Sequence, residues 1–281
     1  MKPGSGLFTV PHFKVGLTLV LVFWSLNWGL PQSLRPAAYL FFPLWLGYAL
    51  VVDALAVART GTSILSRSRK AFVWLFVGSA PAWWLFELIN LRTCNWEYPG
   101  AQVFSDLEYF LLCTVAFSTV MPAVFGTAEL VRSGKWMDRF AQGPRVLPNR
   151  RLAFGLFVVG MMMLSATLLW PETCYPLVWG SVFLLLEPFN ILLRRPSLFD
   201  WLRHGDWRPV ISLACGSLVC GFFWEMWNFH SYPKWVYHTP GAEFLYVFEM
   251  PLLGYLGYIP FAWELFSLRN LILPRKGGPR L

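Results

Sequence analysis

The chain has 281 residues, of which 56% are hydrophobic, 18% aromatic and only 14% charged. A soluble globule of this length cannot bury so much apolar surface, so the composition excludes an ordinary soluble domain and indicates a membrane protein. The net charge of +8 needs no nucleic-acid partner, because the basic residues gather in loops between apolar segments, where membrane topology and anionic lipid explain them.

Segments of about 20 mostly apolar residues predict transmembrane helices. Eight such segments follow one another, which predicts an all-α, polytopic membrane bundle of about eight transmembrane helices. The first segment follows a short basic start, as a signal peptide does, but no small-residue cleavage site comes after it, and we expect a retained helix. The segments are residues 13–30, 37–58, 71–91, 105–131, 152–170, 175–193, 209–229 and 243–268.

Lysine and arginine lie almost entirely in alternate loops of this arrangement. If the N-terminus is cytoplasmic, only Arg35, Arg92 and Lys234 fall outside the cell. The positive-inside rule then predicts a plasma (inner) membrane protein with both termini in the cytoplasm. The cytoplasmic set is Lys2, Lys14, Arg59, Arg67, Arg69, Lys70, Arg132, Lys135, Arg139, Arg145, Arg150, Arg151, Arg194, Arg195, Arg203, Arg208, Arg269, Arg275, Lys276 and Arg280.

The two halves of the chain carry similar polar residues in the same order. This order predicts two parallel four-helix membrane repeats, residues 1–132 and 152–281, joined by a basic cytoplasmic linker, residues 133–151. Asp53 also matches Glu187, with a one-residue shift against the neighbouring Pro-Leu pairs. The main matches are Glu87 with Glu225, Asn90 with Asn228, Trp96 with Trp235, Tyr98 with Tyr237, Pro99-Gly100 with Pro240-Gly241, and Glu108 with Glu249.

Each half is expected to bring two carboxylates and an amide to one depth of the outer leaflet. Glu and Asn three residues apart share a helix face, and the Trp and Tyr residues that follow suit the membrane interface. A protonated buried carboxyl can act as a general acid, and its ionised counterpart can act as the base. The candidate catalytic residues are therefore Glu225, Glu249, Glu87 and Glu108.

Aromatic side chains flank these acids, and their ring faces can stabilise a carbocation. A structural alternative is that each Glu and Asn ties helices together, and that the tryptophans pack or face lipid. His230 and His238 are expected in interfacial loops, with a proton relay as the alternative. The candidate substrate-binding residues are Asn90, Asn228, Trp96, Tyr98, Trp235, Tyr237, Trp224 and Trp227.

The sequence predicts neither a metal site nor a cofactor. No Cys/His spacing resembles a zinc site, and the chain lacks a glycine-rich phosphate loop and an Asp-rich diphosphate motif. Cys94 and Cys174 both fall in predicted outer loops. A disulfide between them is possible in an oxidising compartment, and two unpaired thiols are the alternative.

The motif order resembles that of integral-membrane carotenoid enzymes of the heterodimeric lycopene cyclase and carotenoid hydratase type. The similar residues are Trp235-Val-Tyr237 and Glu249-Met-Pro251-Leu-Leu in the second half, and Trp96-Glu-Tyr98 with Asp106-Leu-Glu108 in the first. The Pro-x-Glu-Glu order of those enzymes is absent from both halves, and eight spans are predicted here. The resemblance implies an isoprenoid or carotenoid-type substrate rather than a particular reaction.

Three functions are consistent with the sequence. The first is an acid/base enzyme that protonates an apolar isoprenoid or other membrane lipid, with Glu225 and Glu249 as the active acids and Glu87 and Glu108 in support. The second is a transporter or proton-coupled carrier, which the helix-breaking residues Pro81, Gly221, Pro251, Gly254 and Gly257 would suit. The third is a non-catalytic subunit of a membrane complex. The sequence leaves the oligomeric state open.

Overall fold

The computed structural model describes residues 6–31 and 35–273. Helices dominate these residues, and the strands are only two residues long. The helices are α1 (Pro11–Gly29), α2 (Phe41–Thr60), α3 (Ile64–Arg67), α4 (Arg69–Thr93), α5 (Asp106–Phe117), α6 (Val120–Arg132), α7 (Arg150–Leu169), α8 (Pro171–Cys174), α9 (Val178–Leu192), α10 (Phe199–Leu202), α11 (Arg208–Asn228) and α12 (Tyr258–Ile272). The strands are β1 (Trp96–Glu97), β2 (Val236–Tyr237), β3 (Tyr246–Val247) and β4 (Met250–Pro251).

Six helical stretches in the described residues are long and apolar enough to cross a membrane, which identifies a candidate multi-pass membrane protein. The prediction of eight spans was therefore too high. Helix α1 forms where the first span was predicted, but it is not among the six. The six stretches are Pro36–Thr60, Arg69–Thr93, Asp106–Arg132, Arg150–Leu169, Pro171–Leu192 and Arg208–Asn228.

The prediction of a helix over residues 243–268 was wrong in its first half. Strands β3 and β4 form a hairpin there, followed by the 3₁₀ segment η6 (Leu252–Gly257), and α12 begins only at Tyr258. Pro251 lacks the backbone N–H that a helix interior needs. Gly254 and Gly257 follow within six residues and weaken a helix further. The apolar composition alone had suggested a span, and the backbone chemistry overrides it.

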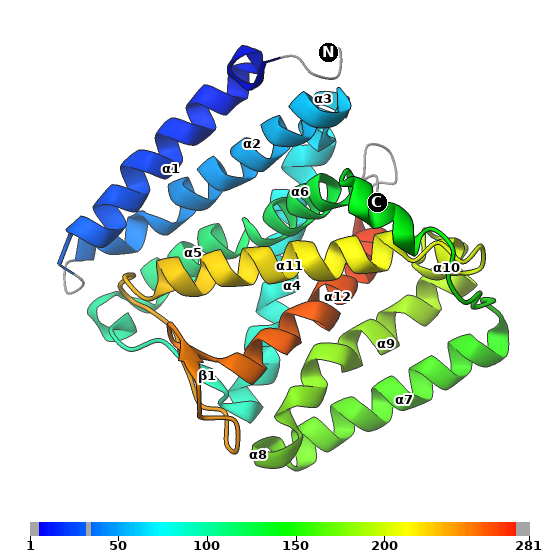
Figure 1. The fold of residues 1–281 in the computed structure, drawn as a ribbon. Helices are drawn as coiled ribbons and strands as arrows, with labels where there is room; N and C mark the ends of the chain where they lie inside the picture. Colours follow the sequence, from blue (N-terminus) through cyan, green and yellow to red (C-terminus); the bar gives the residue numbers. More distant parts are fainter. Residues whose placement is uncertain (1–5, 32–34, 274–281) are drawn as a thin grey trace.

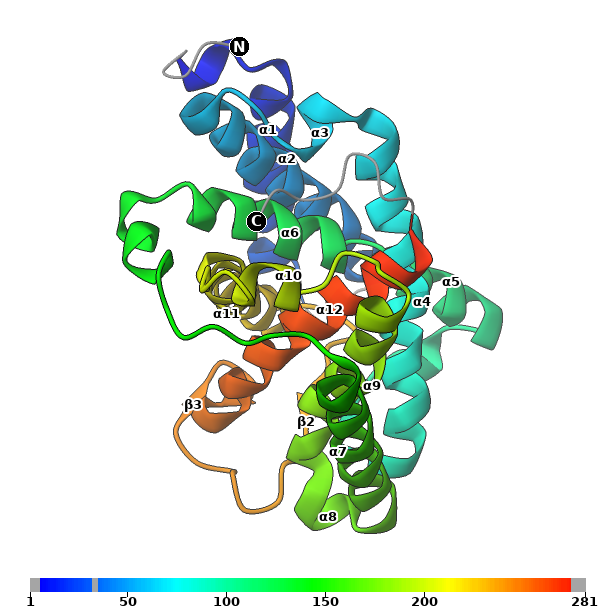
Figure 2. The ribbon, with the colours of Figure 1, turned by 90° about the vertical axis from the view of Figure 1, so that its right-hand side faces the viewer.

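The long helices lie side by side, with a helical pair on each flank of the bundle. Helices α1 and α2 form one outer pair and α7 and α9 the other, while α4, α5, α6, α11 and α12 lie between them (Figure 1). Figure 2 shows the same two pairs at opposite sides of the molecule. The buried core joins residues from both halves of the chain; Trp45, Phe125, Trp227 and Phe261 are among its largest members.

Helices α1 and α2 meet backbone to backbone at two glycines. A Cβ added to Gly16 would lie 2.9 Å from the Gly47 carbonyl oxygen, and a Cβ on Gly47 would lie 2.9 Å from the Gly16 carbonyl oxygen. Small residues permit this close approach between membrane helices.

We expect Gly16→Ala to lower the free energy of unfolding by about 1–3 kcal/mol, because the added methyl group meets backbone atoms that cannot move aside. Thermal unfolding in detergent measures the change. Gly155→Ala is the matched control, since its Cβ would meet no described atom within 4 Å. Equal melting temperatures for the two variants would contradict the close packing of α1 and α2.

One long stretch is broken between α5 and α6. Pro122 cannot donate a hydrogen bond to the preceding turn, and the helix stops at Phe117 and restarts at Val120. The buried Ser79 hydroxyl of α4 donates to the Phe117 carbonyl at 2.6 Å and accepts from the Met121 amide at 3.0 Å. The Ser79 side chain thus provides hydrogen-bond partners for two backbone groups at the break, which lipid could not provide.

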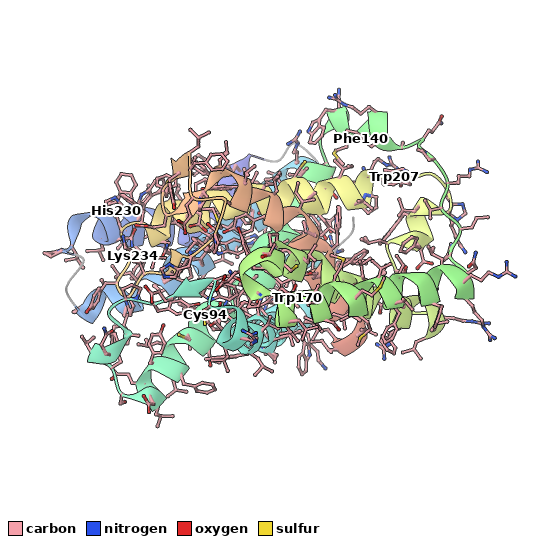
Figure 3. The ribbon with its side chains drawn as sticks, turned by 90° about the horizontal axis from the view of Figure 1, so that it is seen from below. Cys94, Phe140, Trp170, Trp207, His230 and Lys234 are labelled. Atoms are coloured by element: carbon pink, nitrogen blue, oxygen red, sulfur yellow. The ribbon has the colours of Figure 1, made fainter. Side chains whose placement is uncertain are left out.

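The two ends of the bundle differ in chemistry. We call the end where α4 and α11 finish the cap end; Cys94, His230 and Lys234 lie there, and Phe140 and Trp207 lie at the opposite, basic end (Figure 3). Loops between α2 and α4, α6 and α7, and α9 and α11 form the basic end. Its cations include Arg59, Arg69, Lys70, Lys135, Arg139, Arg150, Arg151, Arg203 and Arg208.

A short antiparallel ladder joins the two halves at the cap end. Trp96 of β1 pairs with Tyr237 of β2, and Glu97 pairs with Val236. Asn95 and His238 extend it, since the His238 amide donates to the Asn95 carbonyl at 2.7 Å and the Asn95 side-chain amide donates to the His238 carbonyl at 3.2 Å. Segments that are distant in sequence are thereby fixed beside each other.

Candidate functional site

A largely apolar cavity of about 490 Å³ lies at the cap end, between the two halves of the chain. Helices from both halves and the two loops that carry β1 and β2 form its wall. The cavity is large enough for a small-molecule ligand. Its aromatic lining residues are Phe41, Trp83, Trp96, Tyr98, Tyr109, Phe117, Tyr175, Trp179, Trp224, Tyr232, Trp235, Tyr237, Tyr258 and Phe261.

Glu87 lies just behind this wall, in the last turns of α4. Three donors converge on its Oε1 atom: the indoles of Trp83 at 2.9 Å and Trp96 at 3.0 Å, and the hydroxyl of Tyr98 at 2.5 Å. All three of these aromatic residues line the cavity, whereas Glu87 does not. Any contact between the carboxylate and a ligand therefore passes through an aromatic side chain.

Glu225 has the equivalent position on α11 and is fully buried. Its Oε1 atom accepts from Tyr237 at 2.8 Å and from Tyr258 at 2.6 Å. Its Oε2 atom is buried and has no hydrogen-bond partner among the described residues. Both phenols line the cavity, so Glu225 also lies behind a layer of tyrosine hydroxyl groups.

Asn90 and Asn228 hold the backbone that carries the aromatic residues. The Asn228 side chain donates to the Trp235 carbonyl at 2.7 Å and accepts from the Trp235 amide at 2.9 Å. Asn90 donates to the Trp96 carbonyl at 2.8 Å and accepts from the Asn95 amide at 2.8 Å. Neither asparagine lines the cavity; each fixes the chain as it leaves its helix.

Burial raises the pKa of Tyr98 and of Tyr237 well above the usual value of 10.0, and the neighbouring charges of Glu87 and Glu225 raise the pKa values further. Both side chains therefore remain phenols that donate to the carboxylates. A group whose pKa is higher in the folded than in the unfolded protein stabilises the fold fully at pH values below its unfolded-state pKa. This stabilisation is lost as the pH rises toward the folded-state pKa.

We expect the free energy of unfolding to fall as the pH rises above about 10, the tyrosine pKa of an unfolded chain. Replacing Tyr98 or Tyr237 by Phe should make that fall shallower. Unfolding curves recorded at several alkaline pH values, with tyrosinate absorbance as the probe, measure both effects. Tyr246→Phe is the control, because Tyr246 is 51% exposed. If the free energy of unfolding falls with pH as steeply in Tyr98→Phe and Tyr237→Phe as in the unmodified chain, the two tyrosines do not have raised pKa values.

The two candidate tryptophans of α11 have different surroundings. Trp224 lines the cavity and stacks on Tyr258, with ring centroids 5.8 Å apart. Trp227 does not line the cavity; it is buried against Trp45 and Phe223 in the core. The wall residue is thus Trp224, and Trp227 packs behind it.

Glu108 and Glu249 are not brought to the cavity wall. The hydroxyl of Tyr39 donates to Glu108 at 3.0 Å. Glu249 forms an ion pair with Lys234 beside the β3–β4 hairpin. The two carboxylates expected to share a layer with Glu87 and Glu225 therefore have polar partners of their own.

The cap-end histidines and cysteines lie outside the tyrosine–glutamate contacts. His230 stacks near Trp28, with ring centroids 4.7 Å apart, and His238 lies 3.2 Å from the Glu97 carboxylate. Cys94 and Cys174 are free thiols. In the described part of the chain, no group of three or more His, Cys, Asp or Glu side chains is arranged to hold a metal ion.

Sequence reasoning missed several wall residues. Tyr258 is the second donor to Glu225, although it comes 33 residues later. Tyr109 and Trp179 reach the cavity from other helices, whereas Trp83 had been considered as part of an aromatic pocket beside Glu87. The spacing Trp83–Glu87, one helical turn, is the only signal that sequence reading had for these contacts.

The chain was compared with protein-family models, with curated proteins and with solved structures, and none of the three comparisons found a match.

Proposed function

We propose that this protein is a membrane enzyme that binds an apolar isoprenoid or carotenoid-type lipid at the cap end and changes it by proton transfer. The observation that carries the proposal is the aromatic cavity whose phenols are hydrogen-bonded to two carboxylates behind its wall. An apolar molecule at this wall leaves the hydroxyls of Tyr98, Tyr237 and Tyr258 paired, because Tyr98 already donates to Glu87 and the other two donate to Glu225.

The chemistry follows from the groups at hand. A proton added to a carbon–carbon double bond leaves a carbocation, which the ring faces of Trp224 and Trp235 stabilise. Loss of a proton from a neighbouring carbon then ends the reaction. Substrate and product are isomers, so neither an oxidant nor a nucleotide is consumed.

The hydrogen bonds suggest different roles for the two acids. Three donors converge on Glu87, an arrangement that suits a proton acceptor. Glu225 receives two donors and has a second oxygen without a partner, and an unpaired buried oxygen costs less on a neutral acid than on an anion. We assign Glu225 as the proton source: the hydroxyl of Tyr237 or Tyr258 turns toward the substrate, gives up its own proton and takes the proton of Glu225 in its place. On the other side, the hydroxyl of Tyr98 passes its proton to Glu87 and takes the proton that the substrate loses.

The duplicated architecture belongs to the same proposal. Matched residues make matched contacts: each Asn holds the following Trp backbone, and each Glu accepts from the following Tyr. Asp53 and Glu187 likewise each accept from a serine ten residues later, Ser63 and Ser197. These pairs support two parallel repeats, with the cap end outside and the basic end in the cytoplasm of an inner membrane.

The test is to express the chain in cells that accumulate lycopene and other polyenes and to compare their lipid profiles with those of cells that carry an empty vector. A new isomer of an accumulated polyene is the expected result. An unchanged profile, with the protein inserted and purified in full amount, would reject a polyene substrate. A bound lipid in the purified protein without a new product would instead favour the carrier.

A further inference from the structure

Helix α12 carries a buried carboxyl one turn beyond the cavity wall, and the proposed reaction does not use it. Glu264 of α12 comes one helical turn after Pro260, which lines the cavity. Its side chain is 1% exposed, and among the described residues no other side chain is hydrogen-bonded to either carboxyl oxygen. It faces the backbone of Val182 and Phe183 in α9. A charge left unpaired in such a place is costly, so the position suits a group that holds a proton.

Polar groups continue from Glu264 toward the basic end. Ser267 follows one turn later on the same helix face, about 5–6 Å away between Cβ atoms. Its hydroxyl donates to Glu187 Oε2 of α9 at 2.6 Å. The Ser197 hydroxyl donates to Glu187 Oε1 at 2.8 Å, and the Leu198 amide donates to the same atom at 2.6 Å. Ser197 belongs to the loop between α9 and α10, at the basic end.

The other elements packed around Glu264 offer no alternative to the polar route through Ser267 and Glu187. Helix α11 contributes the thiols of Cys215 and Cys220 and, at the cap end, Glu225. The part of α4 that meets α12, residues 78–86, carries no charge. On α12 itself, the nearest cation in sequence is Arg269, whose guanidinium donates to Asn270. Glu187 is thus the titratable group bonded to Ser267, which lies one turn from Glu264.

The first half of the chain lacks this arrangement. Pro122 of α6 corresponds to Pro260, and Gly126, one turn later, stands where α12 has Glu264. Asp53 accepts from Ser63 and Leu65, the equivalents of two donors to Glu187. Each carboxylate has further partners: His12 Nε2 lies 3.0 Å from Asp53 Oδ2, whereas Glu187 accepts from Ser267 and Asn190 inside the bundle. The second half therefore has a feature that repetition does not explain.

We infer that the α9–α12 seam carries protons between the basic end and the cavity, with Glu264 as the inner proton-binding station and Ser267, Glu187 and Ser197 as the connection. A hydroxyl both donates and accepts, so rotation of Ser267 lets it take a proton from one carboxyl and give another to the next. No bond other than O–H is made or broken. The path gives the cavity a proton supply from the cytoplasmic face, and it rests on the proposed membrane orientation but not on a particular substrate.

Infrared difference spectroscopy of the full chain in lipid nanodiscs, on transfer from H₂O to D₂O, tests the inference. The expected result is a protonated-carboxyl band that is lost in Glu264→Gln and shifted in Glu264→Asp, which retains the acid if the Gln variant fails to fold. Exchange of this band should slow about tenfold in Ser267→Ala and in Glu187→Gln, equal to about 1.4 kcal/mol in the barrier.

Asp53→Asn is the matched control, because Asp53 is the equivalent carboxylate of the first half, and its exchange rate should equal that of the unmodified chain. A band that persists in Glu264→Gln would overturn the inference, as would an exchange rate that depends on neither Ser267 nor Glu187. These readouts need no substrate, so they remain interpretable if the polyene experiment fails.

Discussion

Replacing Glu225 by Gln is expected to lower the yield of the isomerised lipid by about 10²-fold or more, the usual contribution of a general acid. The amide oxygen of Gln still accepts hydrogen bonds from Tyr237 and Tyr258, so the cavity wall keeps its shape. The variant loses only the exchangeable proton. Product yield per amount of inserted protein, in the polyene-accumulating cells, measures the effect.

Glu172→Gln is the control for this substitution, because Glu172 is an exposed carboxylate in α8 at the same end of the bundle. Its product yield should equal that of the unmodified chain. If Glu225→Gln retains full yield while Glu87→Gln loses it, Glu225 is not the proton source and the reaction depends on Glu87. Full yield from both variants would leave the carboxylates as structural ties between helices.

Replacing Asn228 by Ala is expected to lower the free energy of unfolding by roughly 2–4 kcal/mol, since two half-buried backbone groups of Trp235 lose their partners at about 1–2 kcal/mol each. That is a large part of the stability of a typical domain. The loop carrying Trp235 and Tyr237 would no longer be fixed to α11, so lipid binding should weaken as well. Thermal unfolding in detergent, monitored by tryptophan fluorescence, measures the loss.

Gln102→Ala provides the comparison, because Gln102 is an exposed amide in the equivalent loop of the first half. Its melting temperature should not change. A melting temperature for Asn228→Ala within error of this control would show that water replaces the lost hydrogen bonds and that the asparagine is not a structural clamp.

The sequence predicted which residues of the two halves correspond. Glu87 matches Glu225 and Tyr98 matches Tyr237, and the structure joins each Glu to the Tyr of its own half by a hydrogen bond, as in the alternative that the acids tie the bundle together. Repetition succeeds here because one helix end and its following loop contain all the partners. What the matched residues do to a substrate stays a prediction.

Other features depend on how distant helices meet, and no local pattern carries that information. Tyr258 reaches Glu225 because Gly221 of α11 leaves room for its ring. Asn228 was expected to bind substrate, yet its amide is engaged by the backbone of Trp235. From the sequence alone, a polar residue at a helix end could equally bind a substrate or hold the backbone that follows. Only the fold shows which hydrogen bonds it makes.

The helix predicted from residue 243 illustrates a different difficulty. Hydropathy measures transfer to lipid, and it does not register whether a backbone can hold a helix. Leu245 and Phe248 have positive φ angles of 52° and 59°, a conformation that bulky side chains rarely adopt. The turn geometry there is imposed by the hairpin and its packing, which includes Phe222 and Phe229 against Phe248.

The β1–β2 pairing is self-complementary. The two strands match residue for residue: Trp96 with Trp235, Glu97 with Val236, and Tyr98 with Tyr237. If each strand takes the place of the other, the Trp96–Tyr237 pair becomes a Trp235–Tyr98 pair and Glu97 still lies opposite Val236, so the register is unchanged. A polypeptide with a single copy of this strand would therefore pair with a second molecule of itself in the same way. The contact therefore has the two-fold geometry of an isologous dimer interface, formed here within one chain.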